Sequence, residues 1–321
     1  MTQPAMTPEQ QPSKRRFRLP GWLQNTLWVL LTIGLIALIE YIVGWRKIIA
    51  AWSVIPLDVI LVSIGMTLLS YLARAGRLYS HFRHEMQGRF TLSLRVILHH
   101  NLFANVLPMK AGEFSFPILL QRHFSISPAR STGALLSFRI LDLGVLALIG
   151  LVSMVMGYRV MEHMGILIFL LVLIPLIGWL LLKSLHLAAN NWPRLKNISQ
   201  QLIAGLPKQP HEFMRLTGWT LMIWSIKLAG FAWILRSLAE TSFWTAMLAA
   251  LAGDLASTIP VHTPAAFGSF EGGVLAVLLP AGVNQATALS AAVNLHLFLL
   301  GVSCASAAFA LLLGRKANVT R

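Results

Sequence analysis

The chain has 321 residues, of which 56% are hydrophobic and only 12% are charged, and its mean hydropathy is +0.69. Soluble domains carry about 25% charged residues, so this composition excludes an ordinary soluble domain and predicts a polytopic helical membrane protein. The net charge of +15 would also suit nucleic-acid binding. The basic residues lie between apolar segments, however, so membrane topology explains them better and we predict no nucleic-acid partner.

Residues 1–20 are predicted to form a disordered, basic N-terminal tail. Their first part is rich in Pro, Gln and Thr, a composition that buries too little apolar surface to fold. A basic cluster at 14–18 follows, and it precedes an apolar run at 22–44 with the length of a membrane span. This order is typical of an uncleaved signal anchor.

About 20 apolar residues are needed to cross a bilayer, and six segments of the chain meet this length. Two further apolar segments do not, because Pro and Gly interrupt their centres, and each is predicted to form two short helices around a break. We therefore predict an all-α fold with six transmembrane helices and two re-entrant broken-helix hairpins, in one domain over 21–315 with a cytoplasmic tail at 316–321. In the alternative, both hairpins cross the bilayer completely. The predicted spans are 22–44, 54–79, 131–157, 164–182, 215–238 and 284–313, and the broken segments are 91–121 (hairpin one) and 243–280 (hairpin two).

Each hairpin carries a glutamate just past its break, Glu113 in the first and Glu271 in the second. A carboxylate at membrane depth is unfavourable unless it faces a cavity, water or a cation, so each is a candidate functional residue. The alternative is that each caps the returning helix through its N-terminal dipole. The residues that we predict to break the hairpins are Pro108, Gly112, Pro260, Pro264 and Gly268.

The distribution of basic residues predicts the orientation of the protein. Most of them lie at the two termini, around hairpin one and in the central loop at 183–214, all on one side of the predicted topology. Cytoplasmic loops are enriched in Lys and Arg, so we predict a multi-pass protein of the bacterial inner membrane with both termini in the cytoplasm. Hairpin one then enters from the cytoplasm and hairpin two from the opposite face. The residues assigned to the cytoplasmic flanks of hairpin one are Arg74, Arg77, Arg83, Arg89, Arg95, Arg122 and Arg130.

An internal repeat accounts for the two hairpins. Residues 129–139 align without gaps with residues 286–296, which places Arg139 opposite His296. Each unit is a span, a broken hairpin and a span, with repeat one at about 54–157 and repeat two at about 215–313. Because three crossings separate the hairpins, the repeats have inverted topology, a common plan of membrane transporters.

Basic residues around hairpin one are candidates for binding a lipid phosphate. Lys110 lies three residues before Glu113, where it binds a phosphate beside the free N–H groups of the break, pairs with that glutamate, or extends to water. Arg139 and Asp142 have the i, i+3 spacing of one helix face. They form a buried ion pair, or Asp142 orients Arg139 toward an anionic headgroup. Arg122 is either a second phosphate contact or a charge that sets topology.

Other polar residues give weaker predictions. Lys227 and Asp254 lie inside apolar segments as a structural pair or part of a proton path, and nothing in the sequence places them together. His99 and His100 are predicted as polar interface residues. Since no further ligands converge near them, we predict no metal site and no cofactor. The side chain of His296 belongs to a type that titrates near neutral pH.

A combined pattern runs through both hairpins: Asn101…Asn105-x-x-Pro108-x-x-x-Gly112-Glu113, then Arg122 and Arg139-x-x-Asp142, then Pro260…Pro264…Gly268-x-x-Glu271. It resembles the lysylphosphatidylglycerol synthase transmembrane region, the flippase-like domain of the multiple peptide resistance factor, over about residues 20–315. Two positions depart from that family. It often has Pro-Gly-Gly where this chain has Pro264-Ala265-Ala266, and alanine adopts positive φ only with strain, so we expect a differently shaped tip. It often has an arginine in the last span where this chain has His296.

The charged, broken hairpins and the resemblance together imply a lipid translocase. We predict a flippase-like integral membrane protein for an anionic phospholipid or a polyprenyl-phosphate-linked lipid, with membrane lipids as its partners. Arg139 and Lys110 hold the phosphate in this interpretation, and Glu113 and Glu271 gate the cavity or carry protons. Synthase activity is not implied, because the chain contains no soluble aminoacyl-transferase domain. The alternatives are a non-transporting partner of a lipid-modifying enzyme and a membrane-integral transferase; the sequence does not specify the oligomeric state.

Overall fold

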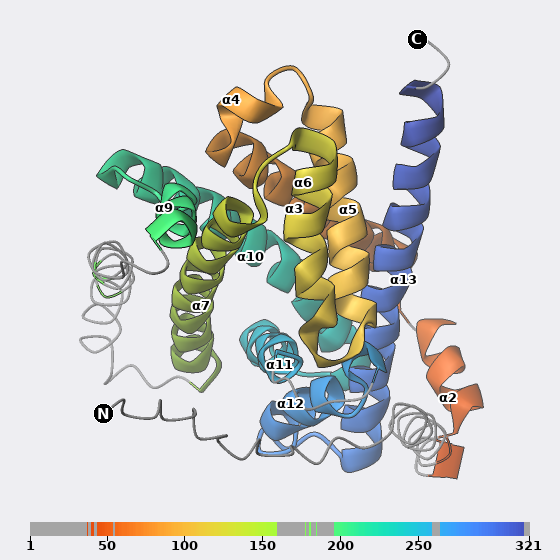
Figure 1. The fold of residues 1–321 in the computed structure, drawn as a ribbon. Helices are drawn as coiled ribbons and strands as arrows, with labels where there is room; N and C mark the ends of the chain where they lie inside the picture. The colour runs from red at the N-terminus through yellow and green to blue at the C-terminus, as the bar shows by residue number, and fades with distance from the viewer. Residues whose placement is uncertain are drawn as a thin grey trace, which may run out of the picture.

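The computed structural model describes residues 37, 40, 41, 44–53, 55–158, 177, 180, 184, 196–258 and 264–317, and every regular element within them is helical (Figure 1). The N-terminal tail at 1–20 lies outside the described residues, as do Pro260 and nearly all of the predicted spans at 22–44 and 164–182. The other four predicted spans are present as long helices.

These four helices are long and apolar enough to cross a membrane. They confirm an all-α, polytopic membrane protein. Each exceeds the roughly 20 residues that a bilayer requires, and each includes or nearly matches a predicted span. The four are α3 (Leu57–His81), α7 (Pro128–Tyr158), α10 (Pro210–Ala239) and α13 (Gln285–Ala317). Short helices accompany them: α2 (Trp45–Ala50), η1 (Ala51–Ser53), α4 (Arg83–Met86) and α9 (Lys196–Ala204).

Both predicted hairpins are pairs of shorter helices joined by a break. Hairpin one consists of α5 (Phe90–Val106), the 3-10 turn η2 (Pro108–Phe114) and α6 (Ser115–Phe124). Hairpin two consists of α11 (Phe243–Ala256), the 3-10 turn η5 (Pro264–Ala266) and α12 (Ser269–Leu278). At 1.5 Å per residue, a helix of 10 residues such as α6 or α12 is about 15 Å long, half of the roughly 30 Å hydrocarbon core.

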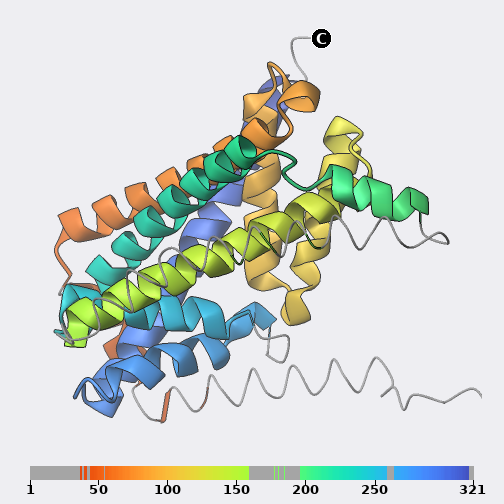
Figure 2. The ribbon, with the colours of Figure 1, turned by 90° about the vertical axis from the view of Figure 1, so that its left-hand side faces the viewer.

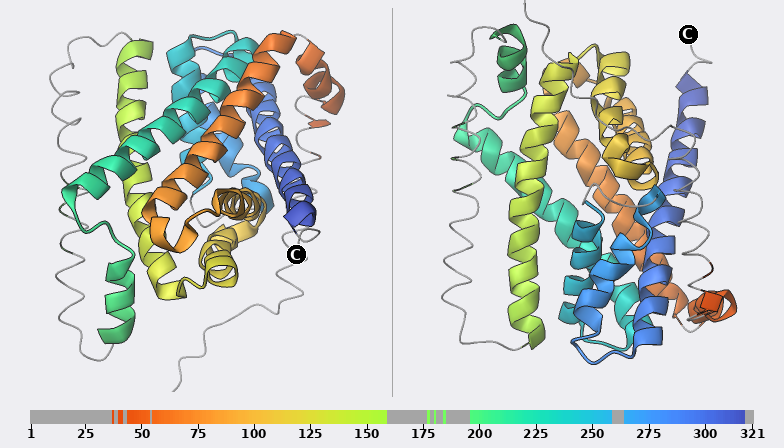
Figure 3. Two further views of the ribbon diagram at one scale, coloured as in Figure 1. Left: turned by 90° about the horizontal axis from the view of Figure 1, so that it is seen from above. Right: turned by 60° about the horizontal axis from the view of Figure 1, so that its bottom comes forward.

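The two hairpins approach one another from opposite ends of the molecule. In Figure 1, α5 and α6 extend downward from the top of the molecule and α11 and α12 lie below them, and the tips of the two hairpins meet where η2 packs against η5. Figure 2 shows the long helices α3, α10 and α7 next to one another, with α10 packed between α3 and α7. Seen from above, hairpin one stands between α7 and α13 (Figure 3).

A glycine closes each hairpin by allowing backbones to touch. A Cβ atom on Gly112 would lie 2.1 Å from the carbonyl oxygen of Phe103, in the facing helix α5. A Cβ atom on Gly273 of α12 would lie 2.4 Å from the carbonyl oxygen of Ala252 in α11. Gly112 is therefore required for close approach and not for a left-handed turn. Among the described glycines of hairpin two, Gly268 has a positive φ (88°), and it precedes α12.

The tip of hairpin two contradicts our expectation that alanine would avoid the left-handed conformation. Ala265 has φ 55° and Ala266 has φ 56°, a region that costs about 1–2 kcal/mol for an L-residue. The alanines thus keep a backbone that suits glycine. The packing of η5 against η2 and α5 holds this conformation.

We expect Ala265→Gly to raise stability by about 1 kcal/mol, because glycine adopts positive φ without steric strain. The measurement is the thermal unfolding midpoint of the purified protein in detergent. The matched control is Ala308→Gly, at an exposed site within α13, where glycine should lower stability by about 1 kcal/mol. If both changes lower the midpoint equally, the left-handed assignment at residue 265 is wrong.

Candidate functional site

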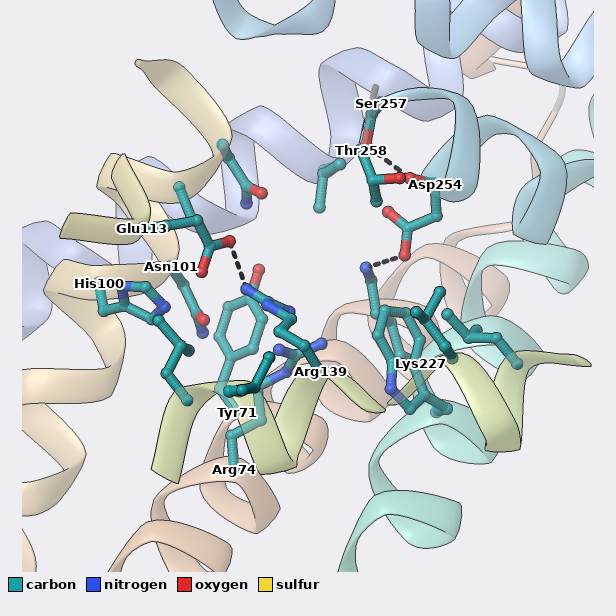
Figure 4. Close-up of a pocket in the computed structure, with 18 of the residues that line it drawn as sticks. Tyr71, Arg74, His100, Asn101, Glu113, Arg139, Lys227, Asp254, Ser257 and Thr258 are labelled. Atoms are coloured by element: carbon teal, nitrogen blue, oxygen red, sulfur yellow. Dashed lines mark hydrogen bonds and ion pairs between the residues drawn. The ribbon is translucent and has the colours of Figure 1, made fainter. Parts of the chain in front are cut away.

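A polar cavity of about 460 Å³ lies at the centre of the described residues, where the tip of hairpin one faces the end of α11 (Figure 4). This is within the range of small-molecule sites. Three basic residues and two carboxylates line it, together with neutral polar and apolar side chains. The principal lining residues are Tyr71, Arg74, His100, Asn101, Asn105, Glu113, Thr132, Arg139, Trp224, Lys227, Asp254, Ser257 and Thr258.

Arg139 of α7 joins hairpin one to the cavity. Its Nη2 forms an ion pair with Glu113 Oε1, at the end of η2, and its Nη1 lies 3.2 Å from Asp142 Oδ2. The Arg139 side chain is 37% exposed, whereas that of Asp142 is 4% exposed. Arg139 therefore faces the cavity, and the buried carboxylate of Asp142 contacts its guanidinium on the side away from the cavity. The i, i+3 spacing predicts this contact between the two side chains. The ion pair between Arg139 and Asp142 is therefore present, and the contact of Arg139 with an anionic headgroup stays a prediction.

Asp142 is the centre of a buried network that ties α7 to α3 and α10. Its Oδ1 accepts hydrogen bonds from Arg77 Nη1 (2.6 Å) and Trp224 Nε1 (3.0 Å). Arg77 Nη1 also donates to Thr220 Oγ1 at 2.8 Å, and its guanidinium lies 4.4 Å from the ring centroid of Phe138. Charge-assisted hydrogen bonds of this kind are the stronger ones in proteins, so the network fixes the three helices relative to one another.

A second ion pair stands on the opposite side of the cavity (Figure 4). Lys227 Nζ of α10 lies 2.5 Å from Asp254 Oδ2 of α11. The ammonium group also lies 4.8 Å and 5.1 Å from the ring centroids of Trp224 and Phe231, which suits cation–π attraction. Ser257 follows directly after α11 and lines the same wall. The structure thus pairs two residues that the sequence left separate.

Arg74 is the cavity residue that the sequence reasoning placed wrongly. We assigned Arg74 and Arg77 to the cytoplasmic flank of hairpin one, but both lie inside α3. The Arg74 guanidinium lies 5.0 Å from the Trp224 ring, and its Nε is buried without a hydrogen-bond partner. In the described part of the chain, no carboxylate oxygen lies within salt-bridge distance of it. Tyr71, Arg74 and Arg77 are three residues apart, so they lie on one face of a helix. This spacing could have indicated that Arg74 belongs to a helix and not to a loop.

Glu271 occupies the capping position that we stated as the alternative to a functional role. Its Oε2 accepts from the backbone N–H of Gly268 (2.7 Å) at the start of α12, and its Oε1 lies 2.7 Å from His296 Nδ1. The imidazole lies 4.7 Å and 4.5 Å from the rings of Phe267 and Phe270. Neither Glu271 nor His296 is among the residues that line the central cavity. The Glu271–His296 contact therefore ties hairpin two to α13, as the Glu113–Arg139 ion pair ties hairpin one to α7. A histidine takes the place of the arginine in hairpin two.

The remaining predicted site residues lie elsewhere or outside the described side chains. Lys110 and Pro108 contribute backbone to η2, and Pro264 to η5, but their side chains are not described. Arg122 is exposed on α6; burial, together with the charges of Arg95, Arg122 and His99, lowers the pKa of His123. Arg122 thus belongs to a basic cluster at the open end of hairpin one. Among the described residues, no three His, Cys, Asp or Glu side chains converge as metal ligands.

The histidines before the break of hairpin one separate in the structure. His100 is buried, lines the cavity and lies 2.9 Å from Ser115 Oγ through its Nδ1. The ring of His99 is half-buried, and its Nδ1 lies 2.7 Å from the carbonyl oxygen of Arg95. Asn101 and Asn105, which belong to the sequence pattern, also line the cavity. Of the two histidines, only His100 therefore contributes to the polar wall.

Comparison with known proteins identifies the family. The sequence model described as the lysylphosphatidylglycerol synthase TM region matches residues 25–306, a range that includes both hairpins and every residue of the central cavity. No curated protein and no solved structure gives a significant match. The match confirms the resemblance drawn from the hairpin motifs. The chain belongs to the lysylphosphatidylglycerol synthase transmembrane region family.

Proposed function

We propose that the protein is a flippase-like lipid translocase and that its central cavity binds the phosphate of a lipid headgroup. The main observation behind this proposal is the environment of Arg74. Its guanidinium faces the cavity, it has an orphan N–H group, and the described residues offer it no carboxylate partner. A desolvated charge without a counter-ion is unfavourable. A bound phosphate would supply that counter-ion, and the planar guanidinium matches it with parallel hydrogen bonds.

The other charges of the cavity fit the same ligand. Arg139 and Lys227 flank Arg74 and are each held by a carboxylate, so a phosphate placed between them would have three cations around it. The carboxylates Glu113 and Asp254 are positioned to accept hydrogen bonds from headgroup hydroxyls or an amine. This arrangement favours an anionic phospholipid or a polyprenyl-phosphate-linked lipid.

Movement would come from the two hairpins. We infer that they are re-entrant halves of an inverted repeat, since they approach from opposite ends and each carries a tip glutamate paired to the following long helix. A bound phosphate would compete with Glu113 for Arg139, so it would weaken the ion pair that ties hairpin one to α7. In the orientation that the basic residues favour, hairpin one opens to the cytoplasm of a bacterial inner membrane and both termini lie there.

The test is lipid translocation by Arg74→Gln in proteoliposomes. Loss of charge-assisted hydrogen bonds worth about 1.5–3 kcal/mol should lower the initial rate for a fluorescent phosphatidylglycerol about tenfold or more. The readout is the fraction of label that a membrane-impermeant reductant can quench over time.

Arg236→Gln is the matched control, because Arg236 is an exposed arginine of α10 outside the cavity, and it should leave the rate unchanged. A phosphate-free diacylglycerol probe should not distinguish the variants. Unchanged phosphatidylglycerol transport in a folded Arg74→Gln protein would refute the headgroup site. Arg74-dependent lipid binding without any translocation would instead favour the non-transporting partner of a lipid-modifying enzyme.

A further inference from the structure

An apolar groove of about 760 Å³ runs between α3, α5 and α13. Its walls include Leu68 and Leu72 of α3, Leu98 of α5 and Phe309 of α13. Leu68, Leu72 and Phe309 are 43%, 42% and 54% exposed. The groove is therefore open at the surface of two long apolar helices, α3 and α13. Its chemistry suits hydrocarbon and offers almost nothing to a polar group.

Among the described residues, the groove and the polar cavity have one lining residue in common. Tyr71 lines both spaces. Its hydroxyl lies 3.0 Å from Ser303 Oγ, and that serine oxygen accepts a hydrogen bond from Asn105 Nδ2 at 2.8 Å. Asn105 itself lines the cavity. A partition of three side chains, one each from α3, α5 and α13, therefore separates the charged space from the apolar one.

Two glycines keep the groove wide. Gly65 of α3 and Gly301 of α13 both line it, and a Cβ atom on either would meet no heavy atom within 4 Å. Glycine inside a helix is less stable than alanine, and neither position has the positive φ that would require glycine. The two glycines therefore contribute to the groove by leaving its volume free of side-chain atoms.

We propose that this groove holds the hydrocarbon chain of the lipid whose phosphate occupies the central cavity, with Tyr71, Asn105 and Ser303 as the portal between them. The inference rests on the proposed function and extends it to the route of entry. An amphiphile needs an apolar and a charged space in contact, and here the two meet at Tyr71. The lipid therefore enters sideways between α3 and α13, headgroup first.

The test separates tail binding from headgroup binding. The tail probe is a phosphatidylglycerol with a photoreactive diazirine near the end of one chain, cross-linked to protein in nanodiscs and competed with unlabelled lipid. The headgroup probe is glycerol phosphate, measured by calorimetry. The variants are Gly65→Leu and Gly301→Leu, which fill the groove. Gly218→Leu is the control: a glycine of α10 outside the groove whose Cβ also meets nothing within 4 Å.

In the wild-type protein we expect saturable tail labelling on peptides of α3 and α13. Each groove-filling variant should reduce that labelling about tenfold and leave glycerol phosphate binding intact, while Gly218→Leu changes neither. Gly65→Ala and Gly301→Ala, which add one methyl group, should give intermediate labelling and keep the result interpretable if leucine impairs folding.

Two outcomes would overturn the inference, and they are distinguishable. Saturable labelling that survives in both leucine variants excludes the groove but leaves the proposed function standing, provided glycerol phosphate binding still requires Arg74. Glycerol phosphate binding that is absent, or insensitive to Arg74→Gln, removes the headgroup site and this inference with it.

Discussion

Replacement of Asp142 by alanine should destabilise the protein by about 3–5 kcal/mol, the usual effect of removing one partner from a buried ion pair. Asp142 accepts hydrogen bonds from Arg77 and Trp224 and lies beside Arg139. Without it, Arg77 keeps a charge that is 5% exposed and loses its carboxylate. The change should appear as a large fall in the thermal unfolding midpoint in detergent.

Two further variants decide whether the lost partner is the cause. Asp58→Ala removes an exposed acid at the start of α3 and should change stability by less than about 0.5 kcal/mol. The double replacement of Arg77 by Met and Asp142 by Leu removes both charges, and it should recover much of the loss because paired apolar residues often replace a buried ion pair without penalty. An Asp142→Ala protein as stable as Asp58→Ala would show that the network does not support the fold.

The second large effect is expected for Gly112→Ala. The added methyl group would lie 2.1 Å from the Phe103 carbonyl oxygen, so η2 and α5 must separate. Overpacking of this kind destabilises by about 1–3 kcal/mol and occasionally more, and here a rigid backbone is the obstacle. Glu113 follows directly and would be displaced from Arg139, so lipid translocation should fall along with the unfolding midpoint.

Hairpin two provides the matched comparison within a single helical turn. Gly273→Ala meets the Ala252 carbonyl oxygen at 2.4 Å, whereas Gly272→Ala meets nothing within 4 Å. Gly273→Ala should therefore destabilise as Gly112→Ala does, and Gly272→Ala should stabilise α12 by up to about 1 kcal/mol. If Gly112→Ala behaves like Gly272→Ala, the close approach of η2 to α5 is not maintained in the protein.

The positions of four long helices, and of the breaks that the structure describes, were predictable. The spans at 54–79 and 131–157 appear as α3 and α7, and the breaks at Pro108 and Pro264 begin the 3-10 turns. The pairing of Arg139 with Asp142 was also predictable, because i, i+3 neighbours on a helix meet whatever surrounds them. Each of these features depends on residues close together in the chain.

The composition of the cavity was not predictable in the same way. Lys227 and Asp254 meet because α10 and α11 fold back on each other, and Arg74 looked like a loop charge because it lies near the end of its apolar run. The choice between function and capping also needed the structure. Glu113 faces the cavity, whereas Glu271, at the matching position, caps α12 and contacts His296.

The sequence by itself determined that this protein is an all-helical, polytopic member of its family with two broken hairpins. The physical reason is that lipid offers no hydrogen bonds, so every backbone group in a span must be satisfied within its own helix, and long apolar runs and their interruptions record that requirement directly. Only the tertiary structure decided which charged side chains line the cavity and which, like Glu271, are paired outside it. Periodicity tells which residues lie on one face of a helix, but the neighbour of that face is set by how α3, α7, α10 and the two hairpins pack together.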